Sequence, residues 1–128
     1  MNLKNLVLFL LMGTLLTSCS SKTDTAAPGA TLYTVRDLME DDPRGTLKQL
    51  ADLGYVNIEA TSYEDGKFYG MEPAEFKEYL EQLGLVPLSV HQGGVTLENA
   101  DRLIADSKAA GFRYFVIPIP PMGHFAID

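Results

Sequence analysis

The stretch that decides the fold is Leu53-Gly54-Tyr55-Val56-Asn57-Ile58-Glu59, because it joins the end of a helix to a strand. Near the end of that strand stands a carboxylate, Glu59. The pattern recurs as Leu-Gly-Leu-Val-Pro-Leu-Ser-Val-His over residues 83–91 and as Ala-Gly-Phe-Arg-Tyr-Phe-Val-Ile over residues 110–117. Each glycine can end a helix in the left-handed conformation, and the β-branched and aromatic residues after it favour a strand. The chain therefore predicts a repeated unit in which a helix leads into a strand.

The spacing of this repeat indicates the architecture. Gly54, Gly84 and Gly111 lie about 30 residues apart, the length of one strand–helix unit. Such alternation predicts an α/β fold with a parallel sheet and right-handed crossovers, either a small doubly wound sheet or part of a (β/α)8 barrel. A complete flavodoxin-like domain is disfavoured because Tyr33–Asp37 holds no glycine-rich phosphate loop. Since a complete barrel needs about 250 residues, we expect a partial TIM barrel with its first four strands and three helices.

Local patterns predict where these elements lie. We expect four strands, at residues 31–35, 55–60, 86–90 and 113–117. The last is apolar and should be buried on both faces. Asp42 should cap a first helix with Pro43 at its first position, Pro73 should begin a second helix, and Thr96 should cap a third. The second helix has a single apolar stripe, formed by Phe76, Tyr79, Leu80 and Leu83.

The N-terminus has the pattern of an exported protein. One cation, Lys4, precedes an apolar run over residues 6–16. That run is too short to span a bilayer and has the proportions of a signal peptide. It ends in Leu16-Thr17-Ser18-Cys19, which resembles the lipobox of bacterial lipoproteins.

This resemblance divides the chain into three parts. Residues 1–18 are expected to be a lipoprotein signal peptide, and Cys19 would carry the lipid. Residues 19–30, rich in Ser, Thr, Ala, Pro and Gly, would form a flexible tether. Residues 31–128 would then be the N-terminal part of the barrel, exported and anchored to a membrane in the periplasm or at the cell surface.

The chain is acidic, with 17 Asp and Glu against 10 Lys and Arg and a formal net charge of −7. A negative domain repels phosphate backbones and anionic lipid surfaces, so we expect no nucleic-acid partner. Neutral sugars and metal cations are compatible with this charge.

Side chains that can carry chemistry stand where the expected strands end. Ligands meet parallel strands at their C-terminal ends, which here carry Arg36, Glu59 and His91, with His124 beyond the fourth strand. A carboxylate and an imidazole on neighbouring strand ends can act as an acid–base pair or as part of a metal site. The loop at residues 61–71 adds aromatic side chains suited to facing a ligand, namely Tyr63, Phe68 and Tyr69.

These residues occur in an order that resembles a known family. Leu32–Asp37, Gly54–Glu59, Ser89–His91 and Val116–Pro118 are similar to the first four strands of the sugar phosphate isomerase/epimerase family, the xylose-isomerase-like TIM barrels. The resemblance implies a divalent metal (Mn, Mg, Co or Zn) that polarises sugar oxygens while acidic side chains move protons between neighbouring carbons.

By position, the resemblance places Glu59 and His91 in the catalytic pocket, with His91 touching substrate or metal. Further candidates for contacts with substrate are Arg36, Tyr63, Tyr69 and His124. The family's principal metal ligands, a Glu, an Asp, a His and a second Glu, come from later strands that this sequence does not include.

The sequence thus predicts a sugar isomerase/epimerase-like protein that acts by metal-assisted proton transfer and is incomplete and inactive as this fragment. Its partner would be a small-molecule sugar, and an exported location favours free or polymeric sugars over phosphorylated ones, although the sequence does not identify the sugar. The alternative is a non-catalytic carbohydrate-binding lipoprotein on the same fold, in which the loop aromatics stack on sugar rings. In either case, the open edges of a half barrel predict marginal stability or self-association.

Overall fold

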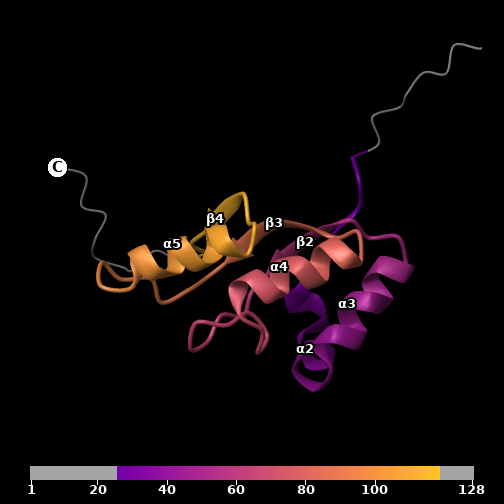
Figure 1. Ribbon diagram of the computed structural model, residues 1–128, viewed down its shortest axis with the longest axis horizontal. Coiled ribbons are helices and arrows are strands. Elements are labelled where there is room, and N and C mark those ends of the chain that lie inside the picture. Colours follow the sequence, from indigo (N-terminus) through magenta and orange to yellow (C-terminus); the bar gives the residue numbers. More distant parts are fainter. Residues whose placement is uncertain (1–25, 119–128) are drawn as a thin grey trace, which may run out of the picture.

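Four parallel strands form the sheet in the order β1-β2-β3-β4, which is also their order in the chain (Figure 1). The structure, a computed structural model, describes residues 26–118. Its elements are β1 (Gly29–Thr31), the 3₁₀ helix η1 (Leu32–Val35), α2 (Arg36–Asp41), α3 (Pro43–Asp52), β2 (Asn57–Ala60), α4 (Pro73–Gln82), β3 (Val86–His91), α5 (Ala100–Ala109) and β4 (Tyr114–Val116). The expected α/β repeat is confirmed, with α2 as one helix more than predicted.

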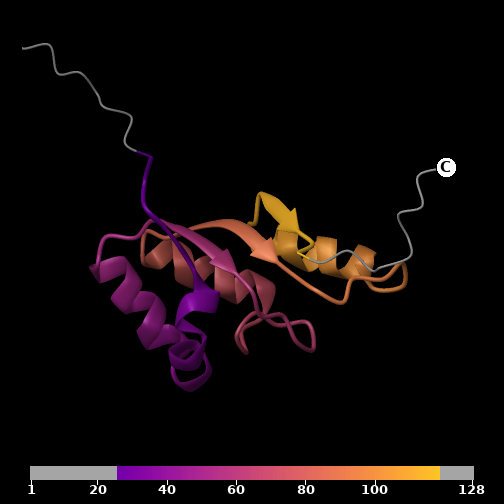
Figure 2. The ribbon, with the colours of Figure 1, turned by 180° about the vertical axis from the view of Figure 1, so that it is seen from behind.

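The strand order decides between the two expected architectures. A doubly wound sheet reverses its direction of winding and carries helices on both faces. Here each crossover moves one strand further in the same direction, so crossovers of constant hand place their helices on one face. Figure 1 shows α4 and α5 in front of the strands, and Figure 2 shows the strands in front from the other side. The architecture is that of a partial TIM barrel.

The first strand is not where the sequence predicts it. Residues 31–35 were expected to be extended, but β1 is formed by Gly29–Thr31, and the chain then turns into η1 and α2. Leu32 and Met39 are buried, and Val35 packs against the same core. These three residues are spaced three and four positions apart, which is the spacing of one face of a helix. The strand therefore begins inside the range expected to be a tether, and the main-chain amide of Asn57 donates to the carbonyl of Pro28, just before it, at 3.1 Å.

The starts of α3 and α4 follow the predicted capping chemistry. Asp42 Oδ1 accepts a hydrogen bond from the amide of Gly45 at 2.9 Å, with Pro43 at the first helical position. Pro73 likewise begins α4, whose Phe76 and Leu80 are buried. The left-handed glycines predicted after the helices are also confirmed, because all three have positive φ: Gly54 (89°), Gly84 (72°) and Gly111 (85°).

Thr96 makes the capping bonds expected of it, although α5 itself starts later. The helix begins at Ala100, with Asn99 as the residue before it. The amide of Thr96 donates to Asn99 Oδ1 at 2.8 Å, the amide of Asn99 donates to Thr96 Oγ1 at 3.4 Å, and the amide of Ala100 donates to the carbonyl of Thr96 at 3.0 Å. The reciprocal bonds of Thr96 and Asn99 are those of a capping box, and they stabilise the turn that leads into the helix. Ile104 on this helix is exposed although it is apolar.

The core lies between the helices and one face of the sheet. Ile58, Ala60 and Val90 are buried there, with Phe115 of β4 packed against them. Aromatic rings extend this core beneath the loop that leads to α4. Phe68 is fully buried, and its ring centroid lies 5.0–5.6 Å from those of Tyr63, Phe76 and Phe112.

The opposite face of the sheet carries no helix in the described part of the chain. Burial of β4 on both faces was expected and is wrong, because Tyr114 is 62% exposed and Val116 38%. These residues are the register partners of Ser89 and His91 on β3, so all four share the open face. Among residues 26–118, β4 has one neighbouring strand and forms an edge of the sheet.

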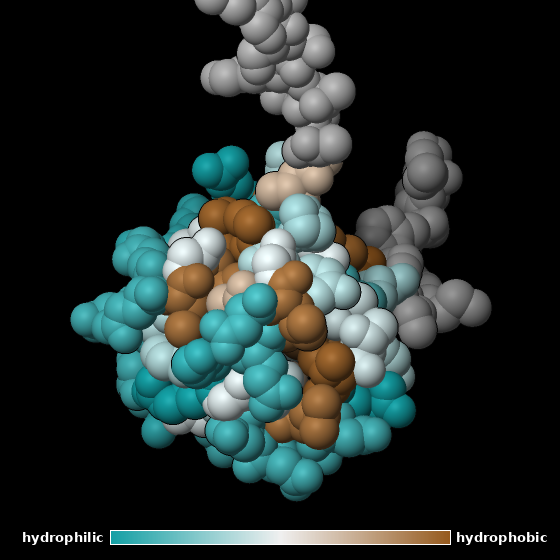
Figure 3. Space-filling model, turned by 90° about the vertical axis from the view of Figure 1, so that its right-hand side faces the viewer, coloured by the Kyte–Doolittle hydropathy of each residue, from teal (hydrophilic) through white to brown (hydrophobic). Residues whose placement is uncertain are grey.

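The end of the molecule where the helices stop and the strands begin also exposes apolar groups. Figure 3 shows apolar side chains among hydrophilic ones on this end. Leu53, the residue that follows α3, is 76% exposed. Within residues 26–118, every helix is too short or too polar to cross a bilayer.

Candidate functional site

Glu59, Ser89 and His91 form a polar cluster on the open face of the sheet, near the C-terminal ends of β2 and β3. Ser89 Oγ donates a hydrogen bond to Glu59 Oε2 at 2.9 Å. The other carboxylate oxygen, Oε1, lies 3.8 Å from His91 Nδ1. Ser89 is buried, whereas the side chains of Glu59 and His91 are 33% and 38% exposed. The carboxylate is thus held on one side and open to a ligand on the other.

A β-bulge brings these three side chains together. Ile58 pairs with Pro87, but the next residue, Glu59, pairs with Ser89, so Leu88 is an extra residue in β3. Pro87 has no amide hydrogen to give to the ladder, which makes an irregularity here inexpensive. Without the extra residue, Leu88 would lie beside Glu59, and Ser89 and His91 would face the core.

The loop between β2 and α4 is built from two successive tight turns. Glu64 and Lys67 bond each other's backbones, as do Phe68 and Met71. The central pairs, Asp65-Gly66 and Tyr69-Gly70, all have positive φ, between 50° and 88°. Two central residues with positive φ are the mark of type I′ turns, so the loop has a defined conformation.

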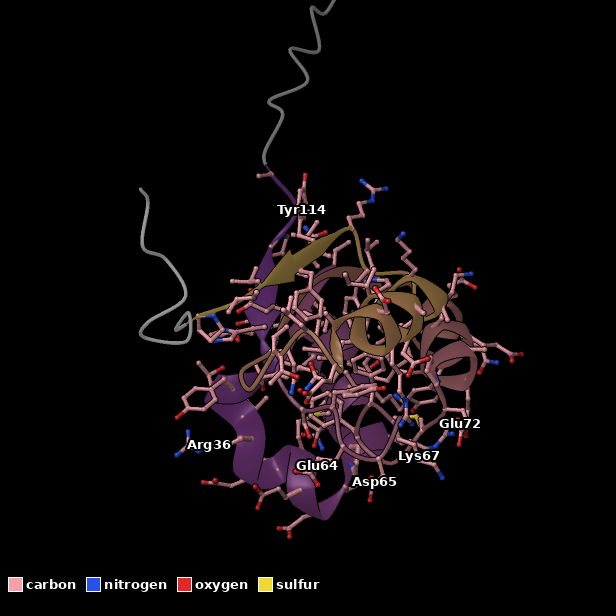
Figure 4. The ribbon with its side chains drawn as sticks, turned by 90° about the vertical axis from the view of Figure 1, so that its left-hand side faces the viewer. Arg36, Glu64, Asp65, Lys67, Glu72 and Tyr114 are labelled. Atoms are coloured by element: carbon pink, nitrogen blue, oxygen red, sulfur yellow. The ribbon has the colours of Figure 1, made fainter. Side chains whose placement is uncertain are left out.

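This loop and α2 enclose a cavity of about 340 Å³, which we call the α2 hollow. Its polar lining includes Arg36 of α2 and Lys67, Tyr69 and Glu64 of the loop. Figure 4, drawn from the end where the strands finish, shows Arg36 on one side and Glu64 and Lys67 on the other. Both cations have a carboxylate neighbour, Arg36 at 3.6 Å from Asp37 and Lys67 at 3.3 Å from Glu72.

Tyr69 joins the α2 hollow to the end of β2. Its hydroxyl accepts a hydrogen bond from the amide of Thr61 at 2.9 Å, immediately after β2. Burial raises the pKa of Tyr69, hydrogen bonds from the backbone of residues 61 and 62 oppose that rise, and the charge of Glu59 adds to it. The phenol therefore stays protonated and can donate a hydrogen bond near the carboxylate.

The structure divides the predicted site residues into groups. Glu59 and His91 are brought together, and Arg36 and Tyr69 share the α2 hollow. Tyr63 lines a different cavity, next to α5, and its hydroxyl donates to Asp106. Burial, aided by that hydrogen bond, raises the pKa of Tyr63. The remaining candidates, Cys19 and His124, lie outside the described residues.

One predicted role is wrong and one residue was missed. Phe68 was expected to face a ligand, but it is fully buried among other rings and cannot stack on a sugar. Ser89 was overlooked as a site residue, although it stands two positions before His91 and a strand repeats its face every two residues. That spacing would have identified it as the neighbour of His91 on the same face.

The described residues lack the set of ligands that a complete metal site needs. They contain no group of three or more His, Cys, Asp or Glu side chains arranged to hold an ion. Glu59 and His91 offer two ligands of suitable chemistry, whereas structural and catalytic zinc sites use three or more protein ligands. Residues 26–118 do not fit a complete metal centre.

Two solved structures from Parabacteroides distasonis ATCC 8503 match this fold. One is 26% identical, covers 80% of this chain and 42% of its own, and superposes with a TM-score of 0.56. The other is 22% identical, covers 69% of this chain and 39% of its own, and has a TM-score of 0.55. Both are described as a sugar phosphate isomerase/epimerase. This chain has their fold.

The resemblance found in the sequence is confirmed by these neighbours at the level of the fold. The chain spans about two fifths of the length of the sugar phosphate isomerase/epimerase structures it matches. No protein-family model and no curated protein sequence matches it.

Proposed function

We propose that this chain is part of a sugar isomerase/epimerase-like protein in which Glu59 and His91 line the sugar pocket. The observation that supports this most directly is the Glu59–Ser89–His91 cluster on the open sheet face. It lies near the C-terminal strand ends, where TIM-barrel enzymes carry their active sites. The two sugar phosphate isomerase/epimerase neighbours support the same class of ligand.

The reaction proposed is transfer of a proton between neighbouring sugar carbons. A base removes the proton from the carbon beside the carbonyl, and the C–H electrons form an enediolate. A proton then passes from the oxygen of that carbon to the former carbonyl oxygen, and the protonated base returns its proton to the former carbonyl carbon. Glu59 is suited to act as the base, because Ser89 holds its Oε2 by a hydrogen bond while the side chain stays partly exposed. The 3.8 Å between its Oε1 and His91 Nδ1 is too long for a direct hydrogen bond, so neither atom uses up the hydrogen-bonding capacity of the other.

The divalent metal (Mn, Mg, Co or Zn) remains part of this proposal only through the family resemblance. If bound, it would polarise the sugar's oxygens. His91 is the residue of this chain best suited to touch it, and the further ligands would have to come from outside the described residues. The lipid anchor at Cys19, and with it export and a preference for free sugars, likewise remains a prediction.

Sugar binding and proton transfer can be tested separately. D-Xylose added to the 128-residue chain should shift the imidazole resonances of His91, and Glu59→Gln should weaken that binding about tenfold, the effect of roughly 1.4 kcal/mol. Glu78→Gln, at an exposed position on α4, is the matched control and should change nothing. Absence of any shift at His91 across a panel of aldoses and ketoses would overturn the proposal.

Proton transfer is followed as deuterium uptake beside the sugar carbonyl in D2O, with and without Mn²⁺. Uptake that Glu59→Gln slows about a hundredfold or more would identify Glu59 as the base. Binding at His91 without uptake in a protein that carries the full barrel would instead favour the carbohydrate-binding alternative. That alternative cannot use Phe68, which is buried.

A further inference from the structure

Within residues 26–118 the sheet ends in two free edges, the strands β1 and β4. Each of these strands is three residues long, Gly29–Thr31 and Tyr114–Val116. Natural proteins protect edge strands from pairing with charged residues, with proline or with a bulge. Neither β1 nor β4 contains a charged residue or a proline, and the bulge of this sheet lies between β2 and β3. Both edges are therefore open templates for another parallel strand.

The sheet face between these edges is uncovered as well. One row of register partners crosses all four strands on this face, and it consists of Thr31, Glu59, Ser89 and Tyr114. The next pair towards the strand ends is His91 with Val116. Tyr114 and Val116 are exposed, although large side chains at such positions fill the interior of a closed barrel.

The two edges differ in side-chain size in a complementary way. On the open face, β4 presents Tyr114 and Val116, whereas β1 presents Gly29 and Thr31. Large residues beside small ones fill an interior without voids or overlap. The edge of β4 therefore fits the edge of β1 better than it fits a second β4, where large residues would meet large residues.

The sequence outside the described residues is too short to supply further strands and helices of this kind. It has 25 residues before the described part and ten after it, whereas one strand–helix unit takes about 30 residues. A second copy of the chain brings four strands with the same two edges. Two copies together have eight strands, the number at which side chains just fill the interior of a barrel.

We propose that two copies of this chain close into one eight-stranded barrel, in which β4 of each copy pairs in parallel with β1 of the other. We call each β4–β1 contact a seam. A two-fold axis along the barrel relates the copies, so the two seams are identical and the assembly stops at two. All strands stay parallel, and α4 and α5 stay outside because they lie on the other face of the sheet (Figure 1, Figure 2).

This dimer brings two Glu59–His91 clusters to one mouth of the barrel. Each cluster lies near the C-terminal ends of β2 and β3, and parallel closure puts these ends of both copies at the same rim. Each copy thus supplies the wall of the pocket that the other lacks. Among residues 26–118 no helix follows β4 to cover the outside of a seam, so we expect a dissociation constant in the micromolar range.

The test is sedimentation equilibrium of the 128-residue chain across the micromolar range. The measured mass should approach that of two copies and go no further, because a closed barrel has no free edge. The measurement needs no sugar, since the inference depends on the strand edges and not on the chemistry of Glu59. Its failure is therefore distinguishable from failure of the proposed function.

Two charged substitutions test which edges meet. Gly29→Glu and Tyr114→Lys each change the first residue of an edge strand, on the open face. A Cβ at residue 29 would lie 3.4 Å from the Cβ of Asn57, an ordinary contact, so this variant should fold. Alone, each variant leaves a charge without a partner in both seams. Its dissociation constant should rise about a hundredfold, about tenfold for each seam.

An equimolar mixture of the two variants decides the pairing. In the mixed dimer, one seam joins the introduced glutamate to the introduced lysine, and the other seam is that of the parent chain. The mixture should therefore dimerise to within about threefold of the parent dissociation constant, although neither variant does so alone. Leu97→Lys, at an exposed apolar residue outside both edge strands, is the matched control and should dimerise like the parent chain.

Four results would overturn the inference. They are a parent chain that stays monomeric, a parent assembly that grows beyond two copies, dimers of Gly29→Glu as stable as those of the parent chain, and a mixture that stays monomeric. Circular dichroism checks that each variant is folded. If either variant is unfolded, the charge-reversed pair of Gly29→Lys and Tyr114→Glu provides the same comparison.

Discussion

Replacement of Ser89 by alanine is the sharpest test of the polar cluster, because a single buried hydroxyl holds the carboxylate of Glu59. A hydrogen bond to a charged group contributes about 1.5–3 kcal/mol. A third of the Glu59 side chain is exposed, so water can replace part of the lost contact. We therefore expect Ser89→Ala to lower the free energy of unfolding by about 1 kcal/mol, which for a domain of this size corresponds to a fall of about 5 °C in Tm.

The described residues offer a matched control in a second buried serine, Ser107. Ser107 Oγ donates to the carbonyl of Leu103 one turn earlier in α5, at 2.6 Å. Alanine has the higher helix propensity, by up to about 0.5 kcal/mol, and this offsets most of the lost hydrogen bond. Ser107→Ala should therefore leave stability nearly unchanged. Urea unfolding monitored by circular dichroism measures both variants under the same conditions.

A double-mutant cycle between Ser89→Ala and Glu59→Gln isolates the contact itself. Residues that interact directly give coupling energies of about 0.5–3 kcal/mol, whereas independent sites add to within about 0.3–0.5 kcal/mol. Equal stability losses for the two serine variants, together with a coupling below about 0.3 kcal/mol, would refute the view that Ser89 positions Glu59. The proposed role of Glu59 would then lose its structural support.

Three further predictions concern other parts of the fold. Phe68→Ala should lower the free energy of unfolding by about 3–5 kcal/mol, because a fully buried ring is lost; a cost below about 0.5 kcal/mol in urea titrations would mean that the ring faces solvent. Tyr69 has a pKa raised above its ordinary value of 10.0, so the stability it contributes is present below pH 10 and is lost as the pH rises through the folded-state value. The stability gap between the parent chain and Tyr69→Phe should therefore narrow above pH 10, and a constant gap in urea midpoints would contradict this. Tyr114→Lys should shift the chain towards monomer in sedimentation equilibrium, because a lysine on an open strand edge opposes pairing with another copy.

The sequence predicted correctly those helix starts and ends that are set by residues within a few positions of them. The glycines at positions 54, 84 and 111, the cap at Asp42 and the start of α4 at Pro73 each depend on backbone chemistry that the sequence states directly. The sequence also predicted that Glu59 and His91 lie near each other. Both residues were placed at strand ends, and neighbouring parallel strands have their ends side by side.

The errors arise where longer-range packing decides between two local patterns. Residues 31–35 are rich in strand formers, yet burial of Leu32 and Met39 on one side requires a helix there. The β4 sequence is apolar on both faces, but exposure depends on what else packs against it, which no local pattern records. The type I′ turn at Asp65-Gly66 was predictable from its dipeptide, whereas the bulge at Leu88 became visible only from the pairing of β2 with β3.

The agreement between strand order and chain order bears on how the protein is made. Within residues 26–118, each strand after β1 pairs with the strand just before it in the chain, so the pairing of these four strands does not have to wait for a distant segment. A chain that emerges from the ribosome N-terminus first can therefore add one strand–helix unit at a time to those already folded. Synthesis and folding would proceed in the same direction, and at each stage the growing sheet would present one free parallel edge as the template for the strand that comes next.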